Sequence, residues 1–263
     1  MAFETSDEQE TLESVRTYYG EVLQSTKDLK TSACCTAEAL PPWQRAIVDE
    51  IHPEVVDRFY GCGSPIPLAL AGATVLDLGC GTGRDCFMLA KLVGERGRVI
   101  GVDMTDAQLE VARRHERYHA EKFGYAQPNT RFLQGYIEDL AGAGIESASV
   151  DLVVSNCVLN LSPDKPRVWR EIARVLKPGG RVAVSDLALL RPLPDSIKAD
   201  VEALVLRMNR GPEAREQHVR RGMQRMVERR IGKGARAPDL IRVEPGELFP
   251  VPRAARQARC VGR

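Results

Sequence analysis

The sequence has no apolar run of about 18 residues, the length that a membrane-spanning helix needs. Its first ten residues, MAFETSDEQE, are acidic and have neither the basic nor the apolar part of a secretory signal. These two absences argue against a membrane partner and against export. We therefore expect a protein of the cytoplasm.

The chain also has no C-x-x-C pair, the spacing typical of a structural zinc site. Its seven cysteines are an odd number, and without an export signal they are expected to be free thiols in a reducing compartment. Free thiolates are soft ligands and nucleophiles. The cysteines are therefore candidates for chemistry rather than for a disulfide framework.

Net charge is small, at +1, but it is unevenly distributed. Residues 205–263 hold 15 Lys and Arg against 6 Asp and Glu, a net charge of +9, which leaves −8 for residues 1–204. A basic tail is often a nucleic-acid contact, but Phe249 is its single aromatic residue on which a base could stack. We expect a solvated, partly disordered tail and no nucleic-acid partner.

The most informative stretch is VLDLGCGTGRDC at residues 75–86. A short apolar run ends in a glycine-rich turn and is followed by apolar residues at helical spacing, which predicts a strand, a glycine loop and a helix. Glycines let the backbone turn sharply and let a ligand lie against the N–H groups of the helix start. The spacing Gly79-x-Gly81-x-Gly83 differs from the G-x-G-x-x-G of dinucleotide-binding proteins.

Two acids accompany this loop. Asp77 lies in the strand just before it, and Asp103 ends the next predicted strand in the sequence GVD. An acid at the second place can accept both hydroxyls of a ribose. The glycine spacing and Asp77 resemble the first motif of the S-adenosylmethionine-dependent methyltransferases, in which an acid beside the loop faces the cationic amino-acid end of the cofactor.

The alternation of strands and helices over residues 71–204 predicts an α/β domain with a parallel sheet covered on both faces. Before it, residues 1–70 contain an amphipathic helix at 7–24, expected to act as a lid, and after it residues 205–263 form the basic tail. The expected strands are 74–79, 98–103, 130–134, 150–155 and 181–186, and the expected helices are 43–50, 84–93, 106–123 and 164–176. Ligands of such sheets bind beyond the carboxyl ends of the strands.

Cysteines fall at several of the expected loops. Cys157 follows the fourth strand, Cys62 lies between two glycines, and Cys34 and Cys35 are adjacent in a loop-like segment. Separated thiolates that converge beside a cofactor suit a soft, thiophilic substrate. Cys80 and Cys86 are instead expected to be packing residues.

Six segments resemble the arsenite S-adenosylmethionine methyltransferases over about residues 10–204. They are SACC at 32–35, FYGCGSPIP at 59–67, LDLGCGTGRDC at 76–86, GVDMT at 101–105, FLQGYIEDL at 132–140 and SNCVLNLSPDK at 155–165. The resemblance implies the Rossmann-like parallel sheet of the class I methyltransferases. It also implies that Cys62 and Cys157 bind trivalent arsenic, while Cys35 or Cys34 supports turnover by thiol chemistry.

The same resemblance implies a set of cofactor-binding residues. They are Asp77, Gly79, Gly81 and Thr82 at the methionyl end, Asp103 at the ribose, Met104, Ile137 and Glu138 around the adenine, and also Cys80, Gly83 and Asn156. The implied reaction, part of arsenic detoxification, moves a methyl group from S-adenosylmethionine to thiol-bound trivalent arsenic. Glutathione or thioredoxin is the implied thiol reductant, and we expect a monomer.

The chain departs from the family after VEAL at residues 201–204. The family usually has a further cysteine shortly after this point, followed by strands that cover the arsenic site. Here Val205 and then LRMNRGPEAREQ follow, and Cys260 is the only later cysteine. The Arg-, Pro- and Gly-rich tail is typical of a different reading frame in a GC-rich gene. On this hypothesis an arsenic ligand is lost and the enzyme is impaired.

Two other functions remain open on sequence grounds. A methyltransferase acting on a small organic carbon or oxygen centre would not need Cys62 or Cys157. A thiol-based protein that binds arsenic without turnover would bind the cofactor but transfer no methyl group. A dehydrogenase is disfavoured, because the glycine spacing is wrong and no separate substrate domain is visible.

Overall fold

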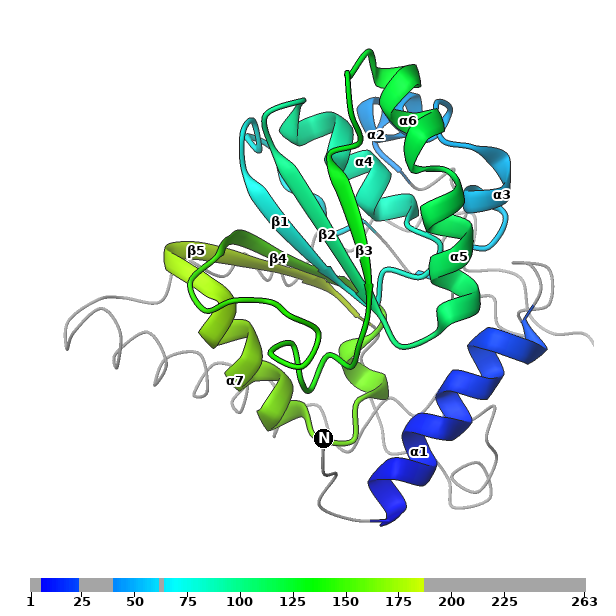
Figure 1. The fold of residues 1–263 in the computed structure, drawn as a ribbon, viewed down its shortest axis with the longest axis vertical. Coiled ribbons are helices and arrows are strands. Elements are labelled where there is room, and N and C mark those ends of the chain that lie inside the picture. Colours follow the sequence, from blue (N-terminus) through cyan, green and yellow to red (C-terminus); the bar gives the residue numbers. More distant parts are fainter. Residues whose placement is uncertain (1–5, 24–39, 62–63, 187–263) are drawn as a thin grey trace, which may run out of the picture.

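The computed structural model describes residues 6–23, 40–61 and 64–186. At its centre is a five-stranded sheet of β1 (Thr74–Leu78), β2 (Arg98–Asp103), β3 (Thr130–Gln134), β4 (Val150–Asn156) and β5 (Leu176–Ser185) (Figure 1). The strand order is β3-β2-β1-β4-β5, and every neighbouring pair is parallel. The order reverses direction between β1 and β4, which places a crevice beyond their carboxyl ends. The predicted α/β class is confirmed.

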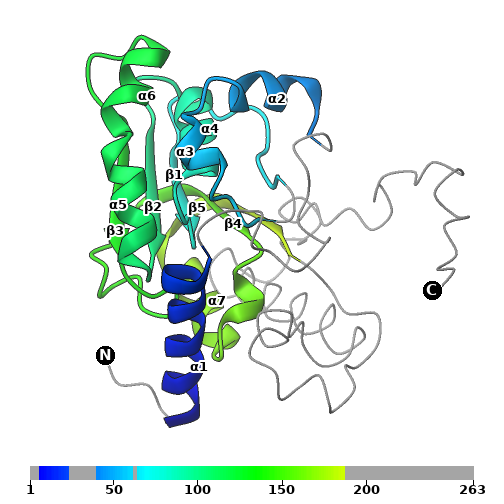
Figure 2. The ribbon, with the colours of Figure 1, turned by 90° about the vertical axis from the view of Figure 1, so that its right-hand side faces the viewer.

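Helices cover both faces of this sheet (Figures 1 and 2). Consecutive side chains of β1 explain the two layers: Val75 joins the core cluster of α4 (Arg84–Val93) and α5 (Asp106–Arg114), and Leu76 joins the cluster of α7 (Lys165–Val175). Two short helices, α2 (Pro42–Val48) and α3 (Pro53–Val56), pack outside α4 and α5. In the described part of the chain, no helix combines the length and the apolar character needed to cross a membrane.

The N-terminal helix lies across the carboxyl ends of the strands. Helix α1 (Ser6–Thr17) continues into one π-helical turn, η1 (Tyr18–Val22), close to the predicted 7–24. The side chains of Leu12 and Val15 on this helix are buried. The backbone oxygen of Tyr19 accepts a hydrogen bond from Gln108 Nε2 at 2.8 Å, which ties η1 to α5.

Two predicted boundaries were wrong. The single helix expected over 106–123 is broken at His115 (φ −102°, ψ 3°) into α5 and α6 (Glu116–Phe123), because the His115 side chain is held by tertiary contacts with α3. Strand β5 begins at Leu176 rather than at 181. Its pairing with β4 shifts register between Val150 and Leu152, and this irregularity accommodates the KPGG turn within the strand.

Three histidines meet where α3 packs against α5 and α6. The rings of His52 and His115 are stacked with centroids 3.7 Å apart, and His115 Nε2 lies 2.7 Å from Glu54 Oε2. His119 Nδ1 donates to the His115 carbonyl oxygen at 2.8 Å, and its Nε2 accepts from the His52 backbone N–H at 3.2 Å. Both ring nitrogens of His119 are therefore used by the neutral imidazole. Burial lowers the pKa of His119 to about 4 and also lowers the pKa of His52.

This arrangement predicts acid-sensitive stability. In the unfolded chain the histidine takes up a proton near pH 6.5, whereas in the folded chain His119 does so only near pH 4. The contribution of neutral His119 to the free energy of unfolding is therefore complete above pH 6.5 and is lost as the pH falls toward 4. We expect the free energy of unfolding to fall by about 3 kcal/mol between these two pH values. Urea unfolding of the parent and of His119→Gln at pH 7.5 and 4.5 isolates the effect, because glutamine does not titrate and its Oε1 can replace Nε2 as the acceptor for the His52 N–H. An equal fall in both proteins would show that His119 is not responsible.

Candidate functional site

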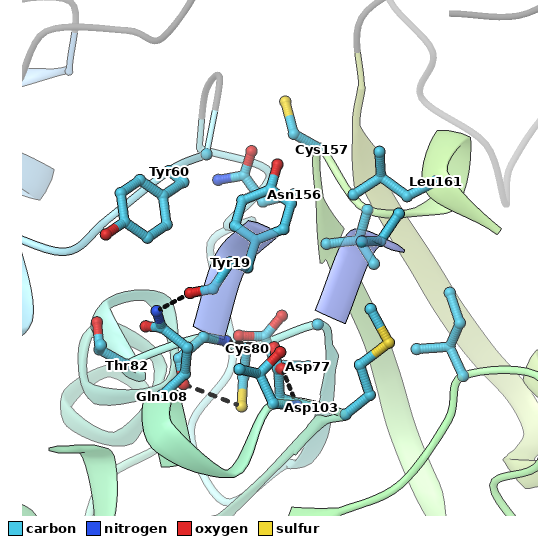
Figure 3. Close-up of a pocket in the computed structure, with 18 of the residues that line it drawn as sticks. Tyr19, Tyr60, Asp77, Cys80, Thr82, Asp103, Gln108, Asn156, Cys157 and Leu161 are labelled. Atoms are coloured by element: carbon cyan, nitrogen blue, oxygen red, sulfur yellow. Dashed lines mark hydrogen bonds between the residues drawn. The ribbon is translucent and has the colours of Figure 1, made fainter. Parts of the chain in front are cut away.

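A pocket opens beyond the carboxyl ends of β1, β2 and β4, beneath α1 (Figure 3). The glycine loop forms one wall, and the α1 side chains Leu12 and Val15 form part of another. The structure brings together ten of the predicted cofactor residues: Asp77, Gly79, Cys80, Gly81, Thr82, Asp103, Met104, Ile137, Glu138 and Asn156. Gly83 lies behind the loop, where an added Cβ would be 2.8 Å from the Phe132 ring.

The glycine loop needs its glycines for two different reasons. Gly79 and Gly81 have φ of 69° and 54°, in the left-handed region that favours glycine. A Cβ on Gly79 would lie 2.4 Å from Val158 Cγ2, so the loop packs closely against the turn after β4. A Cβ on Gly81 would meet nothing within 4 Å, which leaves the backbone there open to a ligand.

Asp103 joins the ends of β1 and β2. Its Oδ2 accepts from the Gly81 N–H at 2.9 Å, and its Oδ1 accepts from the Thr105 N–H at 2.8 Å. Burial raises the pKa of Asp103, and these backbone donors oppose the rise. The Thr105 side chain and the Met104 backbone also lower the pKa of Asp103, so a pair of ligand hydroxyl groups would share the carboxylate oxygens with these donors.

Asp77 is an acid buried at the end of β1, with 2 % of its surface exposed. It accepts a hydrogen bond from the Cys86 thiol at 3.3 Å. Burial, reinforced by the negative charges of Asp85 and Asp103, raises the pKa of Asp77 well above its ordinary range. A cation placed in the pocket would favour the ionised carboxylate. This end of the pocket therefore suits a positively charged ligand group.

A different environment lies near the start of α7. Glu138 is buried and accepts a 2.5 Å hydrogen bond from Ser162 Oγ, and burial raises the pKa of Glu138. Met104 and Ile137 add apolar surface to the same pocket. An acid among apolar side chains suits a flat ring that carries hydrogen-bond donors.

Sequence reasoning missed several lining residues, of which Gln108 is the most informative. Its side chain is 4 % exposed, and among the described residues its Oε1 has no hydrogen-bond partner. Tyr19 and Tyr60, whose ring centroids are 5.8 Å apart, line the same pocket. The available signal for Gln108 was its place in the first turn of the helix after β2, at the carboxyl edge of the sheet.

Cys157 lines the pocket on the turn after β4. It has φ of 60° although it is not glycine, and its N–H donates to the Ser185 oxygen at 2.7 Å. Its sulfur is disulfide-bonded, and its partner is neither Cys80 nor Cys86, since both are free thiols. The other predicted thiols, Cys34, Cys35 and Cys62, lie outside the described residues, so their convergence on Cys157 stays a prediction.

Cys80 and Cys86 are buried free thiols, in agreement with their expected packing role. Burial raises the pKa of Cys80 to about 11 and that of Cys86 well above its ordinary value. Both therefore stay protonated at neutral pH, and a protonated thiol is a poor nucleophile and ligand. Cys80 nevertheless lines the pocket as the resemblance implies.

Known proteins share this architecture. A family model described as a methyltransferase domain matches residues 70–226. The chain belongs to this methyltransferase-domain family. The family match extends past residue 204, where the sequence pattern changes.

Curated relatives that are longer than this chain have names more specific than the family description. The chain is 55% identical over 188 residues to the arsenite methyltransferase of Aquipseudomonas alcaligenes, covering 72% of this chain and 54% of that protein. It is 48% identical over 194 residues to the arsenite methyltransferase of Mus musculus, covering 73% of this chain and 52% of that protein. The chain thus spans about half the length of these curated relatives.

A solved structure agrees with both sequence comparisons. An arsenic(III) S-adenosylmethionine methyltransferase from Chlamydomonas reinhardtii superposes with a TM-score of 0.63 and 47% identity, over 71% of this chain and 62% of that chain. The resemblance predicted from the sequence motifs is confirmed.

The contact between the glycine loop and Val158 gives a stability prediction. Gly79→Ala should lower the free energy of unfolding in two ways. Alanine in the left-handed backbone region costs about 1 to 2 kcal/mol, and its Cβ overpacks against Val158 at a cost of about 1 to 3 kcal/mol. Gly72→Ala has a φ of 75° but no atom within 4 Å of its Cβ, so it carries the backbone cost alone. Urea unfolding of both variants measures the difference. Equal destabilisation would contradict the close packing of Gly79 on Val158.

Proposed function

We propose that this methyltransferase-family chain transfers a methyl group from S-adenosylmethionine to trivalent arsenic bound by Cys157 and Cys62. The observation that carries the proposal is Cys157 itself, a cysteine on the wall of the pocket that also holds Asp77, Asp103 and Glu138. The arsenite methyltransferase relatives and the Chlamydomonas reinhardtii structure support the same substrate.

The pocket has the acceptors that S-adenosylmethionine requires. Asp77 would face its cationic amino-acid end, Asp103 would accept from both ribose hydroxyls, and Glu138 would lie beside the adenine. The buried Oε1 of Gln108 offers one more acceptor that no other described group uses. When bound, S-adenosylmethionine supplies a methyl group on a positively charged sulfur.

The thiols would prepare the arsenic for attack. Two cysteine thiols and arsenous acid form two As–S bonds and release two waters, which leaves the arsenic lone pair free. That lone pair forms the As–C bond, while the electron pair of the breaking S–C bond stays on the sulfonium sulfur. Arsenic carries no proton that must leave, so no strong general base is needed. The chain supplies orientation and, through Leu12, Val15 and Tyr19, exclusion of water.

Methylation takes arsenic formally from the +3 to the +5 state, so a two-electron reductant must restore it. We assign this role to Cys34 or Cys35 together with glutathione or thioredoxin in a reducing cytoplasm. Two thiols that give up two electrons form a disulfide, and Cys157 is disulfide-bonded in this structure. Reduction of that disulfide must therefore precede arsenic binding.

A second function follows from the altered sequence after residue 204. If the tail at 205–263 has replaced the segment that carries an arsenic ligand, the chain binds the cofactor and arsenic but transfers no methyl group. In both cases residues 1–70 provide the lid and thiol segment and residues 71–204 the cofactor domain. A carbon or oxygen methyltransferase would leave Cys157 without a role.

Methyl transfer from labelled S-adenosylmethionine to arsenite distinguishes these functions. We expect the reduced parent to form methylated arsenic, and Cys157→Ser and Cys62→Ser to lose about 100-fold or more, because serine cannot replace a soft ligand. The matched control, Cys260→Ser, should keep full activity. Cofactor binding without product would indicate the binding protein, and full activity of Cys157→Ser would exclude the proposed arsenic site.

Asp103 provides a separate test of the cofactor site. In Asp103→Asn the amide NH₂ must face a backbone N–H or a ribose hydroxyl, so affinity for S-adenosylmethionine should fall about 10- to 100-fold. Isothermal titration of the reduced chain measures this change. Asp106→Asn, which alters an exposed ion pair with Arg113, is the matched control and should bind like the parent. Parent-like binding by Asp103→Asn would contradict the ribose assignment.

A further inference from the structure

A cluster of metal-ligand side chains lies where α3 packs against α5 and α6 (Figure 1). Its members are His52, Glu54 and His115, and none of them lines the pocket described above. Each offers one ring nitrogen or carboxylate oxygen, and the three atoms lie within 4.8 Å of one another. Glu54 and His115 are 61 positions apart in the sequence, so the fold is what brings the cluster together.

Glu54 and His115 already point to one shared position. Glu54 Oε2 lies 2.7 Å from His115 Nε2, and Glu54 Oε1 accepts from Arg114 Nη1 at 2.9 Å. Arg114 thus orients the carboxylate and leaves Oε2 toward the histidine, as the outer partners of ligating carboxylates do in metal sites. The Glu54 side chain is 30 % exposed, which gives an ion a path from solvent.

His52 brings the second imidazole, and its ring is stacked on that of His115. It is also the N-cap of α3, where its Nδ1 accepts from the Glu54 N–H at 3.2 Å. Asn, Asp, Ser and Thr are the side chains preferred at that position, so capping alone explains a histidine poorly. The cap bond is at the long end of the normal range, and His52 can exchange it for a metal–nitrogen bond.

The donor set favours zinc among the common divalent ions. Two imidazoles and one carboxylate are typical zinc ligands, whereas Mg²⁺ and Ca²⁺ prefer oxygen alone. Tetrahedral zinc holds its ligand atoms about 3.4 Å apart, so atoms that now lie within 4.8 Å must approach by at most about 1.4 Å. Rotation of the His52 and Glu54 side chains, both partly exposed, is enough for a movement of this size. His119 is not a ligand, because both of its ring nitrogens are hydrogen-bonded.

We propose that His52, Glu54 and His115 form a zinc site, with water as the fourth ligand, that joins α3 to the junction of α5 and α6. The site does not rest on the proposed methyl transfer, because its three ligands lie outside the pocket. It does reach the glycine loop through the backbone: Val55 lies within α3, and its carbonyl oxygen accepts from Thr82 Oγ1 at 2.9 Å. An ion that fixes α3 therefore also holds this contact with the loop.

Zinc titration of the full chain, labelled with carbon-13 in its histidine rings, tests the site by NMR. The chain has four histidines, so its spectrum holds four ring Cε1–H signals. As zinc is added, the signals of His52 and His115 should move together and reach a plateau, because coordination withdraws electron density from both rings. Mg²⁺ at the same concentration should move neither signal.

Two variants remove one ligand each while keeping the local hydrogen bonding. His52→Asn keeps a good N-cap but loses an imidazole, and Glu54→Gln keeps an acceptor for the His115 N–H but loses the negative charge. Each should raise the zinc Kd, read from the His115 signal, at least about tenfold. His218→Gln is the matched control, since it removes a histidine that is not in the cluster, and it should keep the parent Kd.

The ring signals decide the outcome for this site alone. Stationary His52 and His115 signals in the parent at excess zinc would overturn the proposal, and zinc captured by the cysteines would give that result. A parent-like zinc Kd in both ligand variants would overturn it as well. The His119 signal, recorded before zinc is added, shows that each variant is folded, because its Nε2 accepts from the His52 backbone N–H. Loss of methyl transfer with intact zinc shifts would count only against the proposed function.

Discussion

The hydrogen bond from the Gly81 N–H to Asp103 joins the carboxyl ends of β1 and β2, and the pocket depends on it. The Gly79 and Cys80 N–H groups donate to the Val102 oxygen at 2.7 and 3.1 Å, so the glycine loop is fixed to the end of β2 at three points. Because the loop is fixed, Gly79 can pack against Val158 and so set the position of the turn that carries Cys157. Cofactor loop and thiol turn are therefore parts of one packed unit at the point where the strand order reverses.

The acids of this unit have different roles because their surroundings differ. Asp103 is held by backbone donors, Asp77 lies in a buried site where its charged form is disfavoured, and Glu138 is held by Ser162. Burial raises the pKa of all three, so the pocket gains most from a ligand that brings positive charge and hydrogen-bond donors. That pattern matches a sulfonium nucleoside better than it matches a dinucleotide, whose pyrophosphate is negative.

Short-range sequence patterns predicted most of the fold. Strands 98–103 and 130–134 and helix 84–93 were predicted to the residue, because each combines a clear apolar period with a glycine or acid at its boundary. The break at His115 and the early start of β5 were missed, because contacts between distant segments decide them. The same reason hid the place of Gln108 in the pocket and the buried ion pair between Arg84 and Asp85. Both depend on which strand ends become neighbours, and residue spacing along the chain does not contain that information.

Cys157 carries a further consequence for work on this family. A non-glycine residue with φ of 60° costs about 1 kcal/mol or more, which glycine would avoid. In the reduced chain, where Cys157 has no disulfide to lose, selection for heat resistance alone would therefore favour the substitution Cys157→Gly and discard the thiol. Directed evolution or consensus design that scores only folding would improve the scaffold while removing the cysteine proposed to bind arsenic. Any such screen of this chain needs a thiol-dependent readout at every round.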